Sequence, residues 1–197
     1  MFPNYVWDIS TTDKIIYLTF DDGPTPDITN WTLNLLKHYH AKATFFCIGH
    51  NIDKHPDVYN TIITEQHLIG NHTYNHLKGW KTSVKDYVEN VLKTETLITP
   101  KTELKLFRPP YGKLKTKQAQ QLQQLGYRII MWDVLSFDWD CKMTPEDCLK
   151  GVIKNTKPGS IIVFHDSVKA ERNLKYTLPK MLEHFSKKGY VFKSLPA

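Results

Sequence analysis

The chain has 197 residues and a mass of 23.0 kDa, a length that suits one domain with a full hydrophobic core. Its 41% hydrophobic and 23% charged residues exclude a disordered, collagen-like or coiled-coil protein. The net charge of +6 is spread along the chain, with no basic block interleaved with base-stacking aromatic residues. A solvated basic surface is therefore favoured over nucleic-acid binding.

No apolar run approaches the length of a membrane span, and the longest, residues 161–164, suits a buried strand. The N-terminal sequence MFPNYVWDIS has neither the basic nor the apolar region of a signal peptide. We therefore expect a monomer without a membrane span. Its location stays open between the cytoplasm and export through a signal not visible here.

The chain has three cysteines, an odd count without CxxC spacing, which indicates neither a disulfide framework nor a zinc ribbon. Cys47 lies in an apolar run and is expected in the core. Cys141 and Cys148 are expected to stay unpaired, because a domain of this size needs no disulfide.

Strand-like apolar runs alternate with amphipathic helical stretches from end to end. About seven strands are predicted, over Ile15–Phe20, Ala43–Ile48, His67–Gly70, Lys105–Arg108, Arg128–Val134, Ser160–Phe164 and Tyr190–Ser194. Apolar residues at helical spacing predict helices within residues 28–39, 84–92 and 174–185. This alternation predicts a parallel sheet covered by helices, either open or closed into a barrel. No repeat or linker divides the chain, so residues 1–197 are expected to form a single domain.

Helix boundaries carry their own signals. Thr144 as N-cap, followed by Pro145 and then Asp147, predicts the start of a helix. Gly126 and Gly189 lie where helices are expected to end.

Two adjacent carboxylates, Asp21 and Asp22, follow the first predicted strand. A solvated turn is one interpretation, because Asp and Gly favour turns. Directly after a buried strand, however, paired carboxylates also bind a cation or act as an acid–base pair. Ligands and catalysts gather at the carboxyl ends of parallel strands, so both residues are candidates for a functional site.

Two histidines, His72 and His76, follow the third predicted strand. Four residues apart, they are expected on one face of a helical turn, where both imidazoles can bind one metal ion. The chain has nine histidines, so two unrelated surface residues are the alternative. With Asp22 the set becomes two imidazoles and one carboxylate, which leaves coordination positions open as a catalytic metal site requires.

The fourth and sixth predicted strands are also followed by polar groups. In Arg108–Gly112, RPPYG, two prolines fix the backbone path and hold Arg108 and Tyr111. Arg108 could pair with a carboxylate or cap a helix, and the Tyr111 N–H could donate to an oxyanion. His165 follows an apolar strand, where a hydrogen-bonded core residue is common, but its place among the other polar groups makes it a candidate catalyst.

These stretches, in this order, resemble the polysaccharide deacetylases of the NodB-homology type, carbohydrate esterase family 4. Residues 19–24 read TFDDGP, 72–76 fit H-[ST]-x-x-H, 108–112 read RPPYG, 138–139 end a DxxDW motif, and 163–166 fit the strand that ends in the catalytic histidine. The resemblance implies an α/β fold, a distorted (β/α) barrel of about seven parallel strands with its active site at the C-terminal strand ends.

The resemblance also implies a role for each matched residue. One divalent metal, zinc by preference with cobalt or nickel possible, would be bound by Asp22, His72 and His76. Asp21 would be the general base oriented by Arg108, and His165 the general acid held by Asp138. Trp139 and Val163 would line the acetyl pocket. With the Tyr111 N–H, the candidate catalytic residues are therefore Asp21, Arg108, Tyr111, Asp138 and His165.

The implied activity is hydrolysis of acetyl groups on N-acetylglucosamine-containing or O-acetylated glycans. One departure is Leu135, at the position three residues before Asp138 where the family commonly has Asp, which bears on loop structure and substrate preference. Two alternatives are an amidohydrolase of the same fold acting on small cyclic amides and a catalytically silent carbohydrate-binding domain. The choice of sugar polymer depends on loop shape, which the sequence leaves open.

Overall fold

The computed structural model describes residues 5–99 and 103–196. At its centre lies a curled sheet of parallel strands in the order β1-β6-β5-β4-β3-β2-β8-β7, with β9 also paired to β2. Its strands are β1 (Tyr5–Val6), β2 (Ile15–Asp21), β3 (Thr44–Cys47), β4 (Leu68–Asn71), β5 (Lys105–Phe107), β6 (Tyr127–Ile130), β7 (Val134–Leu135), β8 (Ile161–His165) and β9 (Val191–Lys193).

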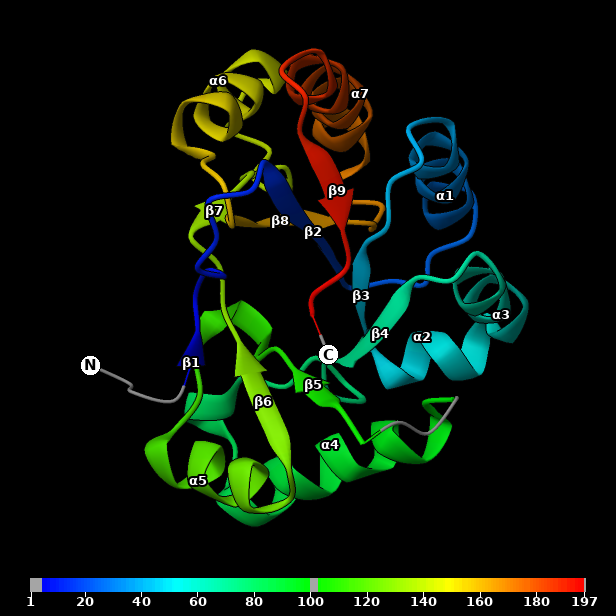
Figure 1. Ribbon diagram of the computed structural model, residues 1–197. Coiled ribbons are helices and arrows are strands. Elements are labelled where there is room, and N and C mark those ends of the chain that lie inside the picture. Colours follow the sequence, from blue (N-terminus) through cyan, green and yellow to red (C-terminus); the bar gives the residue numbers. More distant parts are fainter. Residues whose placement is uncertain (1–4, 100–102, 197) are drawn as a thin grey trace.

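The helices surround this sheet on its outer side (Figure 1). They are α1 (Ile28–His38), α2 (Gly49–Lys54), α3 (Pro56–Thr64), α4 (Val84–Leu97), α5 (Thr116–Gln124), α6 (Pro145–Asn155) and α7 (Glu171–Lys187), with short 3-10 turns η1 (Gly79–Lys81) and η2 (Pro110–Gly112). Within the described ranges, none of the helices combines the length and apolar character needed to cross a membrane.

The sheet curls until the chain after β1 reaches the start of β8. The Ile9 amide donates to the Gly159 carbonyl at 2.9 Å, and Asp8 bridges Ser160 in antiparallel fashion. Gly159 has φ +83°, and a Cβ there would lie 1.9 Å from the Ile9 oxygen, so only glycine allows this approach. The predicted distorted (β/α) barrel is confirmed, with nine short strands in the described part of the chain rather than about seven.

The predicted strand Arg128–Val134 is wrong in one respect, because it forms two strands, β6 and β7. The chain leaves the sheet at Ile130 and Met131, whose carbonyl oxygens accept hydrogen bonds from the Arg108 guanidinium at 3.3 and 2.8 Å. Asp133 then bonds to the Ser160 hydroxyl and the Ile161 amide at the start of β8. These long-range partners redirect the backbone and break an apolar run that is continuous in the sequence.

The helix signals are confirmed. The Thr144 hydroxyl caps α6 by accepting a hydrogen bond from the Asp147 amide at 3.1 Å, with Pro145 in the first turn. Gly126 and Gly189 follow α5 and α7 with φ of 87° and 79°, the left-handed conformation that ends a helix. All three cysteines are free, and Cys47 lies in the core.

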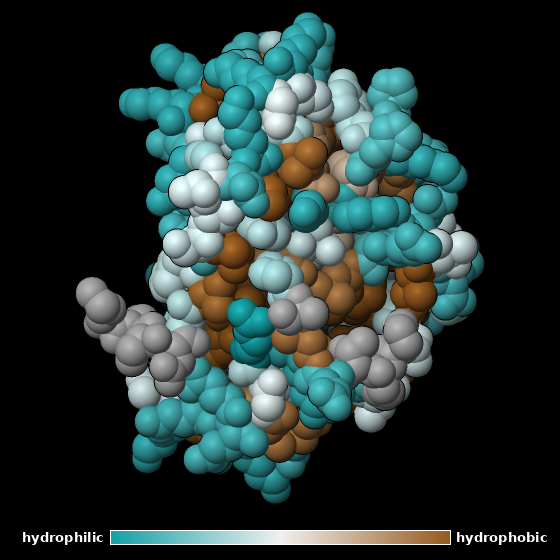
Figure 2. Space-filling view, in the orientation of Figure 1, coloured by the Kyte–Doolittle hydropathy of each residue, from teal (hydrophilic) through white to brown (hydrophobic). Residues whose placement is uncertain are grey.

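Strand β2 divides the interior into two sides by alternation. Ile16, Leu18 and Phe20 pack in the large core cluster shared with α1, α6 and α7. Tyr17 belongs to a second cluster inside the barrel with Phe46, Leu106, Ile130, Ile161 and Leu195. In the space-filling view, hydrophilic side chains cover the outer helices, while apolar side chains gather in the middle of this face (Figure 2). Thr19 and Asp21 share the parity of Tyr17, so β2 carries polar groups into the barrel interior.

The buried His67 is expected to make the stability of the protein depend on pH. It is 8% exposed and accepts the Ala43 amide at Nδ1, 3.1 Å away. Burial, followed by the nearby Lys42 charge, lowers the pKa of His67 from 6.5 to about 4. The neutral ring therefore contributes its full stability above pH 6.5, and that stability is lost as the pH falls toward 4.

We expect His67→Asn, which keeps an acceptor for the Ala43 amide but does not titrate, to lose less stability on acidification than the wild type. The pKa shift corresponds to about 3 kcal/mol over the full pH range. Urea unfolding at about pH 7 and about pH 4.5 measures the difference. Equal losses in the two proteins would show that His67 titrates normally in the folded state.

Candidate active site

The predicted site residues lie at or just beyond the carboxyl ends of the strands. Asp21 ends β2 and His165 ends β8, and the two are register partners on neighbouring strands. A pocket of about 420 Å³ opens at this edge of the barrel. Its walls are formed by Asp21, Asp22, His72, His76, Pro109, Tyr111, Gly112, Trp132, Leu135, Trp139, Val163, His165, Ser167 and Lys169. Of the predicted residues, Arg108 and Asp138 lie behind this wall, both almost fully buried.

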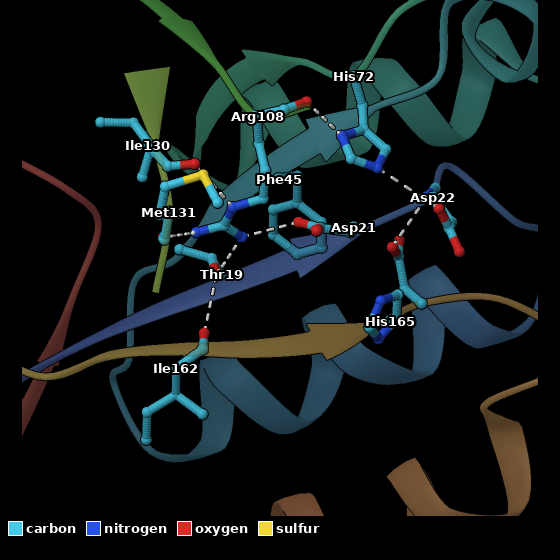
Figure 3. A network of polar contacts seen from close by, with 12 residues as sticks. Thr19, Asp21, Asp22, Phe45, His72, Arg108, Ile130, Met131, Ile162 and His165 are labelled. Atoms are coloured by element: carbon cyan, nitrogen blue, oxygen red, sulfur yellow. Dashed lines mark hydrogen bonds and ion pairs between the residues drawn. The ribbon is translucent and has the colours of Figure 1, made fainter. Parts of the chain in front are cut away.

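The Arg108 guanidinium is completely buried in the barrel beneath the pocket. Its Nη1 donates to Asp21 Oδ1 at 2.8 Å and to Thr19 Oγ1 at 2.6 Å, while Nε and Nη2 donate to the carbonyls of Ile130 and Met131 (Figure 3). Of the two alternatives for Arg108, the structure therefore shows the carboxylate partner. Burial works against the Asp21 carboxylate, but the Arg108 charge and hydrogen bond, with His72 and His165, hold its pKa below the ordinary value. Asp21 is thus ionised at neutral pH.

His165 is held from behind by Asp138. Asp138 Oδ1 lies 2.8 Å from His165 Nδ1, and its Oδ2 accepts the His165 backbone amide at 2.8 Å. Burial disfavours the imidazolium, but the Asp138 carboxylate outweighs it, with Asp22 and Asp21 adding to the effect, and the pKa of His165 rises to about 9. Because Nδ1 donates to Asp138, the Nε2 proton is left for the pocket, and the ring is charged at neutral pH.

Asp22, His72 and His76 form the third group, with one ligand atom from each within 4.8 Å of the others. Asp22 Oδ1 lies 3.7 Å from His72 Nε2 and 3.3 Å from His76 Nε2. His72 Nδ1 lies 2.7 Å from the Arg108 carbonyl, to which it donates, so Nε2 is the ring nitrogen left to face the carboxylate. Burial, with the neighbouring His72 imidazole, lowers the pKa of His76 to about 4, so the His76 ring is neutral at neutral pH.

This arrangement fits a divalent cation. Asp22 Oδ1 is buried without a hydrogen-bond partner among the described residues. His72 Nε2 and His76 Nε2 lie 3.7 and 3.3 Å from that oxygen without a hydrogen bond to it, and a cation bound by all three atoms would satisfy the buried oxygen. Two imidazoles and one carboxylate are ligands that zinc, cobalt and nickel all accept.

The prediction that His72 and His76 lie on a helical turn is wrong. The segment after β4 is a loop in which Thr73 and His76 adopt left-handed φ angles of 63° and 53°. Asn71 Oδ1 accepts the Thr73 amide at 2.9 Å, and Asn90 Oδ1 on α4 accepts the next two loop amides at 2.8 and 3.0 Å. Side-chain acceptors replace helical hydrogen bonds, and the two imidazoles meet through a tight turn instead.

Asp166 lies beside the site, and the sequence interpretation did not single it out. Its buried carboxyl accepts the Gly23 amide at Oδ1, 3.0 Å away, and the Thr29 hydroxyl at Oδ2, 2.6 Å away. Burial, helped by the Asp22 charge, raises the pKa of Asp166 to about 8. This group fixes the turn that gives Asp22 its φ of 83° and separates the directions of Asp21 and Asp22. The available signal was an acid directly after the histidine that ends an apolar strand.

Residues 8–130 match the family model described as polysaccharide deacetylase. A peptidoglycan-N-acetylglucosamine deacetylase of Bacillus cereus is 34% identical over 189 residues, covering 94% of this chain and 88% of the relative. The chain belongs to the polysaccharide deacetylase family. The resemblance to family 4 carbohydrate esterases is therefore confirmed.

Other family members agree. A chitooligosaccharide deacetylase of Azorhizobium caulinodans is 32% identical over 161 residues, covering 80% of this chain and 76% of the relative. The crystal structure of a peptidoglycan N-acetylglucosamine deacetylase in complex with 4-naphthalen-1-yl-N-oxidanyl-benzamide superimposes with a TM-score of 0.92 at 31% identity, over 98% of this chain and 91% of that one. Both the barrel and the deacetylase class are thus shared with these proteins.

The buried Arg108–Asp21 pair predicts a specific pattern of stabilities. Arg108→Met leaves the Asp21 carboxylate buried without its cation, and we expect a loss of about 3 to 5 kcal/mol in the free energy of unfolding. The double variant Asp21→Asn with Arg108→Met should lose less, because no unpaired charge remains. Arg172→Met on the exposed face of α7 is the control and should change stability by less than about 0.5 kcal/mol. A double variant less stable than Arg108→Met would contradict the pairing.

Proposed function

We propose that this polysaccharide deacetylase hydrolyses acetyl groups on N-acetylglucosamine-containing or O-acetylated glycans with the help of one divalent metal. The observation that carries the proposal is the convergence of three groups on one pocket. An ionised Asp21 and a protonated His165 occupy neighbouring strand ends, beside the cluster of Asp22, His72 and His76. The relatives described above, deacetylases of peptidoglycan and of chitooligosaccharide, support the same chemistry.

The metal would be bound by Asp22, His72 and His76, with zinc as the first choice and cobalt or nickel as alternatives. A bound divalent ion supplies Lewis acidity, which would polarise an acetyl carbonyl and lower the pKa of water to about 7. The hydrogen bond from His72 Nδ1 to the Arg108 carbonyl fixes the tautomer in which Nε2 is the ligand.

Asp21 and His165 would divide the proton transfers between them. Asp21 is bound to Arg108 through Oδ1, so Oδ2 is the atom that takes a proton from the attacking water. The water oxygen forms a bond to the acetyl carbon, and the C–N or C–O bond to the sugar breaks. His165 Nε2 gives its proton to the departing sugar atom, which an amide requires because an amide anion is a poor leaving group. Acetate and a free amino or hydroxyl group result.

The remaining pocket residues would hold the acetyl group. Tyr111 adopts a left-handed φ of 61° in η2, a conformation sparsely populated by non-glycine residues and typical of functional sites. Its backbone N–H is assigned to the oxyanion, a contact typically worth a few kcal/mol of barrier. Val163, Trp139 and Leu135 give the pocket an apolar wall for the acetyl methyl. An aspartate in place of Leu135 would make this wall polar.

Acetate release from a panel of acetylated glycans and small cyclic amides, with chelator and with added Zn²⁺ or Co²⁺, tests the proposal.

Asp21→Asn should abolish turnover while the protein still binds metal, because the ligand set is untouched. His76→Ala should lose both turnover and metal. The matched controls are Asp13→Asn and His38→Ala, two exposed positions. Wild-type turnover in Asp21→Asn at saturating metal would refute the base assignment.

The role of His165 predicts a shift in the pH profile. Because the Asp138 carboxylate raises the pKa of His165 above its ordinary 6.5, the acid stays protonated through neutral pH. In Asp138→Asn that support is lost, so the alkaline limb of kcat/KM should move to lower pH while metal content is unchanged. An alkaline limb at the same pH in both proteins would exclude His165 as the acid.

A further inference from the structure

Exposed aromatic side chains lie on or beside the walls of the pocket, which Tyr111 and Trp139 line. Trp80 is 41% exposed, Tyr111 50% and Phe137 44%. The Tyr111 ring packs on His76 with centroids 4.6 Å apart and meets the Trp80 ring edge-on at 5.5 Å. These rings therefore form a continuous surface that begins at the predicted metal cluster and extends outward, where sugar rings beyond the acetylated one would lie.

Three lysines lie close to aromatic rings around the pocket, two beside this surface and one beside Trp139 on the opposite wall. Lys78 Nζ lies 5.7 Å from the centroid of Tyr111, and Lys113 Nζ lies 5.9 Å from that of Trp80. Across the pocket, Lys169 lines the wall with its Nζ 5.0 Å from the Trp139 ring. All three side chains are exposed, and none forms an ion pair with a carboxylate of the described chain. Their ammonium groups thus keep donors free for a ligand.

The segments that carry Lys78 and Lys113 are locked together by buried contacts. Gln118, fully buried, donates to the Gly79 carbonyl at 2.9 Å and accepts the Lys115 amide at 2.8 Å. A Cβ on Gly79 would lie 2.9 Å from the Lys113 carbonyl oxygen, so the two backbones touch. The positions of both lysines relative to the aromatic surface are therefore built into the fold.

The negative charges of the pocket do not neutralise these lysines. Asp21 is paired with Arg108, and Asp138 with His165. Asp22 lies in the cluster with His72 and His76. The three rim lysines consequently leave an excess of positive charge at the entrance, which attracts anions and raises their rate of association.

We propose that the substrate is an anionic glycan, with carboxylates on the sugars next to the acetylated residue that Lys78, Lys113 and Lys169 recognise. This inference rests on the proposed deacetylation and adds the charge of the substrate. A neutral glycan could stack on the same rings, but it would leave the three ammonium groups without partners. Exposed cation–π contacts are worth only about 0.5 to 1 kcal/mol, so a lysine can leave its ring for a carboxylate at little cost.

A matched pair of substrates isolates the charge. One is a fragment of alternating N-acetylglucosamine and N-acetylmuramic acid with free lactyl carboxylates, and the other is the same fragment with those groups converted to carboxamides. We expect kcat/KM of the metal-loaded enzyme to be roughly tenfold higher for the carboxylate form at low salt. This ratio should fall toward one at about 0.5 M NaCl, where charges are screened.

The triple variant Lys78→Gln, Lys113→Gln, Lys169→Gln should bring the ratio close to one at low salt, because kcat/KM for the carboxylate form falls more than kcat/KM for the carboxamide form. The control exchanges three exposed lysines of α6 and the end of α7, Lys150→Gln, Lys154→Gln and Lys188→Gln. It has the same net charge as the rim variant. This control should retain the ratio. A ratio of one in the wild type, or an equal loss in both triple variants, would overturn the inference. Absence of acetate release from every substrate would instead refute the proposed deacetylation.

Discussion

The buried ion pair between Arg108 and Asp21 is the constraint on which the rest of the structure depends. A guanidinium inside a barrel loses its hydration, which costs several kcal/mol unless every nitrogen finds an acceptor. Here the acceptors come from β2 and from the carbonyls at the end of β6, and the Phe46 ring lies 4.2 Å from the guanidinium carbon. Satisfying one cation therefore joins three strands, ends β6 at Ile130 and keeps Asp21 ionised at the pocket.

Buried polar contacts also make the two adjacent aspartates point in different directions. Asp21 points inward to Arg108, while Asp22, at a φ of 83°, turns toward the two imidazoles. The buried Asp166 carboxyl holds this turn through the Gly23 amide, where a Cβ would lie 2.0 Å from Asp166 Oδ2. Left-handed non-glycine residues recur around the pocket at Thr73, His76 and Tyr111. Such conformations persist only where surrounding contacts hold them, so rigidity at the site is supplied by its supporting shell.

Charged side chains are paired inside the site but lack carboxylate partners at its entrance in the described chain. Inside, Asp21 and Asp138 each face one cationic partner, and ligand atoms of Asp22, His72 and His76 converge on a position suited to a metal. At the entrance, lysines rest over aromatic rings without carboxylate partners in the described chain. The candidate catalytic groups are thus held by buried pairs, while the ammonium groups at the rim have no carboxylate partners in the described chain.

The sequence by itself determined the βα order and the type of chemistry, because parallel strands bring the residues after them to one edge. It also predicted the Thr144 cap and the glycine helix ends, which depend on neighbours a few residues away. Only the tertiary structure decided that Arg108 meets Asp21, 87 residues distant, that 128–134 forms two strands, and that the two histidines meet through a left-handed loop. It also revealed the Asp166 support and the lysine rim. These features depend on contacts between distant segments, and no local preference of the chain specifies such contacts.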